Sequence, residues 1–217
     1  MIERYSRKEI RNIWTDKNKY KIWLDIELAS AEAMEKLNII PKGVVKKIKS
    51  RAKIDVARIL KIEESVKHDV IAFLTSINEK AGKEARFLHK GMTSSDVLDT
   101  CFSLQLKKSG EILLNDIKIL LVSIKKQAIK HKKTLCIGRS HGIHAEPITF
   151  GLKMLTFYQE FLRNKKRLED SIIEISICAI SGAVGTFANI DPRVESYVAK
   201  KLKLKVEPVS TQIIPRD

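Results

Sequence analysis

The sequence is poor in cysteine, proline and aromatic residues, and it has no long uninterrupted apolar run. Its three cysteines, Cys101, Cys136 and Cys178, are widely spaced and form no Cys-x-x-Cys pair, which argues against a disulfide framework or a zinc motif. We expect reduced thiols in the core. No apolar run approaches the ~18 residues of a membrane span, and Met1 leads directly into polar sequence without a signal peptide. These absences predict a cytoplasmic protein with no membrane partner.

Acidic residues are also in short supply, with 26 Asp and Glu against 41 Lys and Arg and a net charge of +15. Such an excess attracts nucleic acid or polyanionic small substrates. The basic residues are dispersed in small groups along the chain and are not gathered with aromatic residues, which is typical of solvated helix faces. We therefore expect no specific nucleic-acid partner. A basic helical protein that binds nucleic acid or another anion remains the alternative of a different class.

Apolar residues make up 44% of the chain and recur with the helical period along most of it. The expected helices begin at Ser6 with a Ser-x-x-Glu capping box, span about 19–38, follow Pro41, and then cover about 54–64, 69–81, 93–131, 149–179 and 192–202. A helix of some 35 residues is roughly 50 Å long, so its apolar stripe needs cover from other long helices, including those of partner subunits.

The expected fold is therefore all-α. Residues 1–110 are predicted to form a small N-terminal helical domain that includes the start of the first long helix. Residues 111–217 are predicted to form the first part of a long-helix bundle. The last residues, Ile213-Ile214-Pro215-Arg216-Asp217, are typical of the approach to another helix, which predicts that the bundle is truncated here.

A cluster of functional side chains lies in Arg139-Ser140-His141-Gly142-Ile143-His144-Ala145-Glu146-Pro147. His141, in a turn bounded by Gly142 and Pro147, is a natural proton donor or acceptor near neutral pH. Two solvated histidines in a loop are the structural alternative. A zinc site built from His141, His144 and Glu146 is disfavoured because Pro147 interrupts the helix on which the usual His spacing depends. We expect no metal.

A second candidate site lies at the start of the first long helix, in Gly91-Met92-Thr93-Ser94-Ser95-Asp96. The Thr-x-x-Asp spacing is that of a helix cap. A helix N-terminus with free N–H groups and several hydroxyls is also a ready site for a carboxylate or a phosphate. An ordinary cap is the alternative.

Together with Arg4-Tyr5-Ser6, Lys67-His68-Asp69, the glycine-bearing segment 181–186 and Gln212, these segments resemble the adenylosuccinate lyase branch of the fumarase/aspartase superfamily. The resemblance extends along the whole chain in order and spacing. It implies that Arg4 and Tyr5 hold the nucleotide phosphate, and that Lys67, His68 and Asp69 line the nucleotide site, with His68 supporting catalysis. It also implies that Thr93 and Ser94 hold a succinyl carboxylate. His141 would be the general acid, and Gln212 would contact the substrate.

The family eliminates fumarate from adenylosuccinate to give AMP, and from the succinylated aminoimidazole carboxamide ribotide of purine synthesis. The resemblance also implies a homotetramer with active sites shared between subunits, and no cofactor. Such an elimination needs a base, an acid and fixed charges around the carboxylates. The family's Ser-Ser-x-Met-Pro-x-Lys-x-Asn loop, whose serine is the base, is absent from residues 1–217, and Ser140 replaces the more usual threonine. Argininosuccinate lyase or another lyase of the superfamily is the enzymatic alternative.

Overall fold

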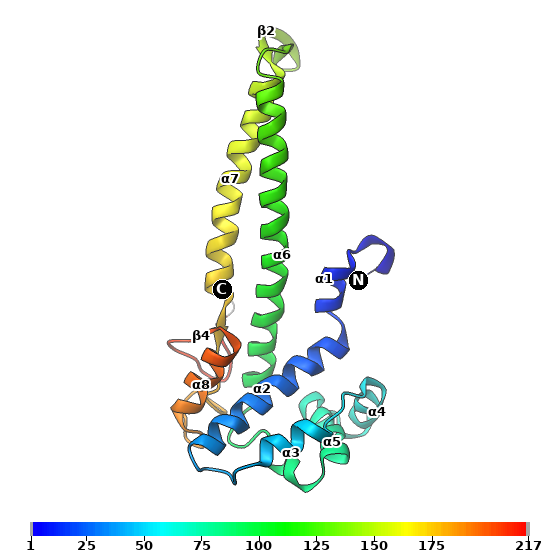
Figure 1. The fold of residues 1–217 in the computed structure, drawn as a ribbon, viewed down its shortest axis with the longest axis vertical. Helices are drawn as coiled ribbons and strands as arrows, with labels where there is room; N and C mark the ends of the chain where they lie inside the picture. Colours follow the sequence, from blue (N-terminus) through cyan, green and yellow to red (C-terminus); the bar gives the residue numbers. More distant parts are fainter. Residues whose placement is uncertain (1, 216–217) are drawn as a thin grey trace. The chain divides into compact units, whose positions relative to one another are not determined.

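The computed structural model describes residues 2–215, and its contacts divide the chain into two compact units (Figure 1). The core unit comprises Met1–Leu106 and Ser176–Asp217, and the hairpin unit comprises Lys107–Ile175. Contacts within this chain thus group the residues from Ser176 onward with the N-terminal ones. The domain division 1–110 and 111–217 stays a prediction. Arg216 and Asp217, on which the expected continuation partly rests, lie outside the described residues.

The core unit is built mainly of helices. Its elements are η1 (Glu3–Tyr5), α1 (Lys8–Ile13), α2 (Asp16–Lys36), α3 (Val44–Arg51), α4 (Val56–Val66), α5 (Asp69–Ala81), η2 (Lys83–Phe87), the beginning of α6 (Ser94–Lys130), β3 (Ile177–Cys178), α8 (Pro192–Leu202) and β4 (Lys205–Val206). The all-α class is confirmed, with a few short strands added.

Side chains at the N-caps explain where several of these helices begin. Thr15 accepts a hydrogen bond from the Asn18 N–H at the start of α2, and Asp55 does the same for Arg58 in α4. Asp191 caps α8, whose first residue is Pro192.

The capping box predicted at Ser6 is wrong. The η1 turn brings the Ser6 hydroxyl to the carbonyl of Ile2, to which it donates at 3.3 Å. Helix α1 begins at Lys8, and its N-cap is Arg7, whose side chain does not cap the helix. The short helix expected directly after Pro41 likewise begins later, at Val44, because Gly43 adopts a left-handed conformation with φ 86°.

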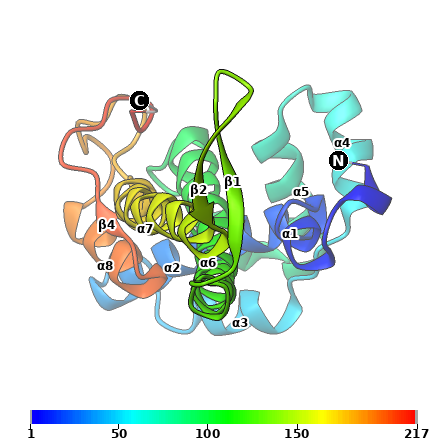
Figure 2. The ribbon, with the colours of Figure 1, turned by 90° about the horizontal axis from the view of Figure 1, so that it is seen from above.

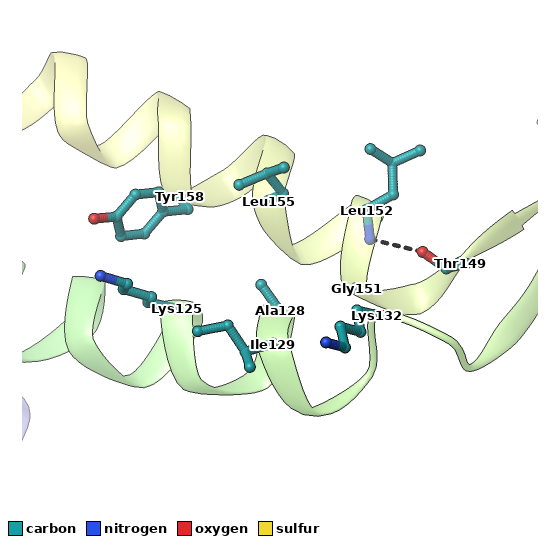
Figure 3. Close-up of a pocket in the computed structure, with 9 residues that line it drawn as sticks. All are labelled: Lys125, Ala128, Ile129, Lys132, Thr149, Gly151, Leu152, Leu155 and Tyr158. Atoms are coloured by element: carbon teal, nitrogen blue, oxygen red, sulfur yellow. Dashed lines mark hydrogen bonds between the residues drawn. The ribbon is translucent and has the colours of Figure 1, made fainter.

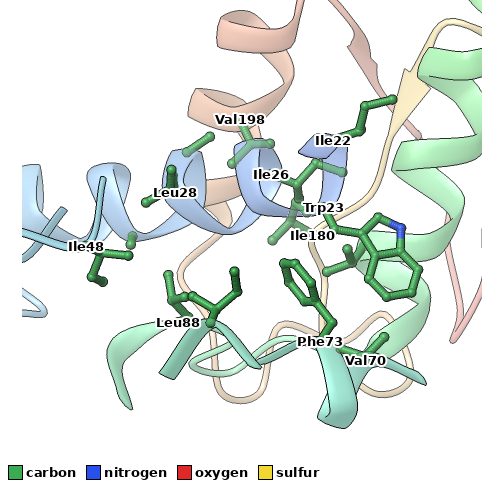
Figure 4. Packing of buried hydrophobic residues seen from close by; sticks show 14 of the residues in the cluster. Ile22, Trp23, Ile26, Leu28, Ile48, Val70, Phe73, Leu88, Ile180 and Val198 are labelled. Atoms are coloured by element: carbon green, nitrogen blue, oxygen red, sulfur yellow. The ribbon is translucent and has the colours of Figure 1, made fainter. Parts of the chain in front are cut away.

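The core of this unit is organised around α2 (Figure 4). Trp23 is almost fully buried, and its ring meets Tyr20 and Phe73 edge-on, with centroids 5.1 and 5.5 Å apart. Each such pair adds about 0.5–1.5 kcal/mol beyond the burial of its area. Val198 of α8 and Ile48 of α3 are also buried in this cluster, so α2 is apolar on more than one side.

The hairpin unit contains the rest of α6, the strands β1 (Leu135–Ser140) and β2 (Ile143–Thr149), and α7 (Phe150–Ile175). Two glycines let α6 and α7 approach closely. A Cβ on Gly110 would lie 2.7 Å from Cγ1 of Ile172, and a Cβ on Gly151 would lie 2.5 Å from the carbonyl oxygen of Ala128. The two helices therefore run side by side (Figure 1).

The long helix expected to reach residue 179 ends earlier, at Ile175, where the chain enters β3. Tertiary partners satisfy the extended backbone: the carbonyls of Ser176 and Cys178 accept from Lys205 and Glu207, at 2.8 and 3.0 Å. Apolar periodicity continues through this segment, and contacts from distant residues override it.

The cysteines divide between the two units. Cys101 and Cys178 are buried thiols, as expected, and burial raises the pKa of Cys178 to about 12. Cys136 is only half-buried on β1, so its placement in a core was wrong. Within residues 2–215, no helix combines the length and apolar character that crossing a bilayer requires.

Candidate active site

The predicted general acid, His141, occupies the tip of the β1–β2 hairpin (Figure 2). Ser140 pairs with Ile143, which leaves His141 and Gly142 as a two-residue turn. Both have positive φ, 51° and 75°, as a type I′ turn requires. The His141 side chain is exposed. The sequence predicts that Pro147 bounds this turn, but Pro147 lies within β2, opposite Ile137.

A bulge interrupts the hairpin ladder. Ile137 pairs with Pro147 and Arg139 with His144, so β2 has one more residue than β1 between these pairs. Gly138 lies opposite the bulge, and a Cβ there would be 2.6 Å from the Glu146 carbonyl oxygen. Position 138 of β1 therefore requires glycine, because the Glu146 carbonyl of the bulge occupies the space of a side chain. Across residues 2–215, no three His, Cys, Asp or Glu side chains are grouped so as to hold a metal ion.

In the core unit, the start of α5 meets the start of α6. His68 is the N-cap of α5, as predicted, and its Nδ1 accepts from the Ile71 N–H at 3.4 Å. Its Nε2 lies 3.5 Å from Oγ of Ser94. Because Nδ1 accepts, the neutral ring carries its proton on Nε2, which faces the Ser94 hydroxyl. Two predicted site residues from distant parts of the sequence are thus brought together.

The neighbours of His68 have separate local roles. Lys67 ends α4 in a left-handed conformation with φ 55°, and its side chain is exposed. The Asp69 carboxylate accepts from the Val70 N–H at 2.7 Å and lies 3.5 Å from Nδ1 of His68. Lys67 thus closes α4, and Asp69 bonds within the first turn of α5.

The predicted cap at the start of α6 is present, and its carboxylate also binds a distant segment of the chain. Asp96 is buried and accepts from the Thr93 N–H at 2.9 Å. The same carboxylate accepts from the N–H groups of Ser181 and Gly182, each at 3.1 Å. Burial raises the pKa of Asp96, and the three backbone N–H groups offset part of this rise.

A buried ion pair near this site was not predicted from the sequence. Glu27 of α2 is fully buried, and its two carboxylate oxygens lie 2.6 Å from Nδ1 and from the backbone N of His89. Burial lowers the pKa of His89, but the hydrogen bond to Glu27 together with the charges of Glu27 and Asp96 outweighs it, so the pKa is raised. One sequence signal could have identified this pair: Glu27 occupies a position in α2 at which the helical period, through Trp23 and Leu28, predicts an apolar residue.

The remaining predicted residues lie at the surface. The Arg4 guanidinium stacks 4.7 Å from the centroid of the Tyr5 ring, and both side chains are exposed. Gln212 is also exposed, in a segment held to α6 by the Ile214 N–H, which donates to the buried Asp99 at 3.0 Å. No described contact joins Arg4, Tyr5 or Gln212 to the His68–Ser94 pair. The roles assigned to these residues, and to His141, stay predictions.

The chain is similar to known proteins over its whole length. It is 48% identical to "Adenylosuccinate lyase" of Bacillus subtilis (strain 168), 51% to that of Synechocystis sp. and 50% to that of Thermotoga maritima. Each match covers 100% of this chain and 50% of the relative. The chain therefore spans about half the length of the curated relatives it matches.

Solved structures agree on the fold. A fumarate lyase from Mesorhizobium sp. BNC1 superposes with a TM-score of 0.89 at 26% identity, covering 94% of this chain and 50% of that one. A 3-carboxy-cis,cis-muconate lactonizing enzyme from Pseudomonas putida gives 0.86 at 25% identity, over 95% of this chain and 49% of that one. A family model described as "Lyase" matches residues 3–217, and the chain accordingly belongs to this lyase family.

Proposed function

We propose that the protein is an adenylosuccinate lyase, which eliminates fumarate from adenylosuccinate and from the related succinylated carboxamide ribotide. The observation that carries this proposal is the identity of 48–51% to three adenylosuccinate lyases across all 217 residues. These matches span every segment that resembles the family's site, from Arg4 to Gln212.

The chemistry fits the residues in hand. Breaking the C–N bond needs a proton on the departing nitrogen, and His141 is the proposed donor because its ring is exposed at the hairpin tip. Thr93 and Ser94, at the N-terminus of α6, are proposed to hold a substrate carboxylate, where N–H groups and hydroxyls favour an anion. Arg4 and Tyr5 are proposed to hold the nucleotide phosphate.

We further propose that the hairpin unit assembles with other copies into a homotetramer with shared active sites. Apolar side chains line the exposed faces of its helices, including Leu113, Ile119, Val122, Ile129 and Ile173. A groove of about 400 Å³ between α6 and α7 is walled by Leu152, Leu155 and Tyr158 (Figure 3). Exposed apolar surface of this extent is typical of a face that another subunit covers. We also propose a cytoplasmic location, with which cysteines that form no disulfide within the described residues are consistent.

The test is fumarate release by the purified protein, at the length that its gene encodes, from adenylosuccinate and, separately, from argininosuccinate. Release from adenylosuccinate alone is the expected result. Release from argininosuccinate alone would replace this proposal with the alternative lyase. Residues 1–217 by themselves should be helical and larger than a monomer by sedimentation, yet inactive, because the family's base-bearing loop is not among them. Fumarate release by residues 1–217 would show that the base lies within this segment.

A further inference from the structure

Asp96 has more hydrogen bonds than a helix cap requires. In a capping box, the side chain at the third helical position accepts one bond from the N-cap N–H, and Thr93 provides that bond. The other two bonds come from Ser181 and Gly182, about 85 residues further along the chain. Both carboxylate oxygens are engaged: Oδ1 accepts from Ser181, while Oδ2 accepts from Thr93 and Gly182.

The segments that meet at Asp96 are packed too tightly for extra side-chain atoms. A Cβ on Gly91 would lie 2.1 Å from the carbonyl oxygen of Asn189, and a Cβ on Gly182 would lie 3.3 Å from the carbonyl oxygen of Gly91. Both glycines have positive φ, 72° and 83°. The position of one segment therefore fixes the position of the other, and the Asp96 carboxylate joins them.

What Asp96 holds is the part of α6 that bears the predicted carboxylate-binding groups. The Thr93 N–H donates directly to Asp96, and Ser94, the next residue, has its Oγ 3.5 Å from Nε2 of His68. The Asp96 side chain itself is only 2% exposed, so substrate does not reach it. A displaced Thr93 backbone would move the N–H groups and hydroxyls that face an incoming anion.

We propose that Asp96 is a positioning residue for the substrate's dicarboxylate end, acting through Thr93, Ser94 and the 181–182 loop. This inference rests on the proposed function. It predicts that damage at Asp96 weakens binding of a dicarboxylate while leaving the nucleotide end of the site almost unaffected.

Two isosteric amide variants separate this role from a general loss of stability. Asp96→Asn keeps the shape of the side chain but replaces one of its two acceptor oxygens with an NH₂ group, which cannot accept a hydrogen bond. The N–H groups of Thr93, Ser181 and Gly182 donate to both oxygens, so at least one of these bonds breaks. Glu195→Gln is the matched control. Glu195 is also a buried carboxylate, and its one described bond, from the Ile180 N–H at 2.8 Å, uses a single oxygen that an amide can replace.

The experiment measures the affinities of the full-length protein and both variants for succinate and for AMP by calorimetry. Hydrogen exchange of the peptide covering 178–187 is followed in parallel. Asp96→Asn should weaken succinate binding at least about tenfold, the equivalent of one charge-assisted hydrogen bond, and change AMP binding by less than about threefold. Exchange in the 178–187 peptide should accelerate. Glu195→Gln should leave both affinities near those of the parent.

Equal losses for succinate and AMP in Asp96→Asn, or no loss for either, would overturn the positioning role. A parent protein that binds no succinate would overturn it too. A parent that binds succinate, loses it in Asp96→Asn and yet releases no fumarate from adenylosuccinate would leave the role of Asp96 standing while the proposed function fails.

Discussion

The two units of this chain bury their apolar residues to very different extents. The core unit encloses Trp23, Tyr20 and Phe73 almost completely. Among the described large apolar side chains of the hairpin unit, only Leu121 falls in the buried class, while many others on α6 and α7 are exposed. The core unit therefore contains its own stabilising interior, whereas the hairpin unit leaves much of its apolar surface exposed.

The same contrast holds for the predicted site residues. His68 and Ser94, beside the capping residue Asp96, form hydrogen bonds inside the core unit. His141 stands on an exposed turn of the hairpin unit. The predicted binding groups His68 and Ser94 are thus held by hydrogen bonds between helices, and the proposed proton donor is held by a turn. Substitutions in the two units should separate stability from catalysis.

The largest expected effect is catalytic and belongs to the hairpin unit. His141→Ala in the full-length protein should lower kcat by about 10²–10⁴, the usual loss when a positioned proton donor is removed. Its melting temperature should hardly change, because an exposed side chain at a turn packs little. His144→Ala, another exposed histidine of the same hairpin, is the control and should retain turnover. Unchanged kcat in His141→Ala would remove this residue from the mechanism.

The next effect is structural and belongs to the core unit. Trp23→Ala should destabilise the protein by about 3–5 kcal/mol, because it leaves a cavity beside Tyr20 and Phe73. Ile143→Ala, at an exposed position of the hairpin, should cost less than about 0.5 kcal/mol. Urea unfolding followed by circular dichroism measures both. Comparable losses for the two variants would contradict the contrast between the units.

A smaller effect is expected at the surface of the core unit. Arg4→Ala should weaken AMP binding by about 1.5–3 kcal/mol, the range for a charge-assisted hydrogen bond. Arg4→Lys should recover only part of this, since lysine lacks the planar fork of donors. Lys8→Ala removes a nearby exposed charge and is the control. Calorimetric affinities that match the parent in Arg4→Ala would place the phosphate elsewhere.

The smallest effect is a pH dependence of stability from the buried His89–Glu27 pair. Because the pKa of His89 is raised in the folded protein, the folded protein keeps this proton at pH values above the unfolded pKa of 6.5. Stability from this pair is fully present below pH 6.5 and is lost as the pH rises through the folded pKa. The slope should approach about 1.4 kcal/mol per pH unit at most.

Melting temperatures measured upward from pH 6.5 check this sign. His89→Gln should flatten the curve, and His144→Gln, an exposed histidine, should leave it sloping downward. A slope that persists in His89→Gln would assign the dependence to other groups.

Much of the helical fold was predictable because its signals are local. His68 at the start of α5, Gly82 at its end and Asp191 before α8 were identified from residue type and spacing. The continuous apolar period of α6 was equally informative. The predicted range, 93–131, differs from the observed Ser94–Lys130 by one residue at each end.

The features that were missed depend on contacts between distant residues. The Glu27–His89 pair joins positions 62 residues apart, and the end of α7 is determined by partners in β4. The strand β2 was missed because Pro147 suggested a turn, although apolar and polar residues alternate from Ile143 to Glu146. Of the site, the meeting of His68 with Ser94 required the structure, since nothing local relates α5 to α6.

The bulge in β2 has a consequence for changes in chain length. In a regular strand, successive side chains point to opposite faces, so one added residue exchanges the faces of everything beyond it. Removing Ala145 would regularise the ladder opposite Gly138 and keep His144 paired with Arg139 on the same face, with the two-residue turn still at the tip. The ladder would thus tolerate a deletion at the bulge, whereas a deletion elsewhere in β2 would turn the side chains beyond it to the opposite face.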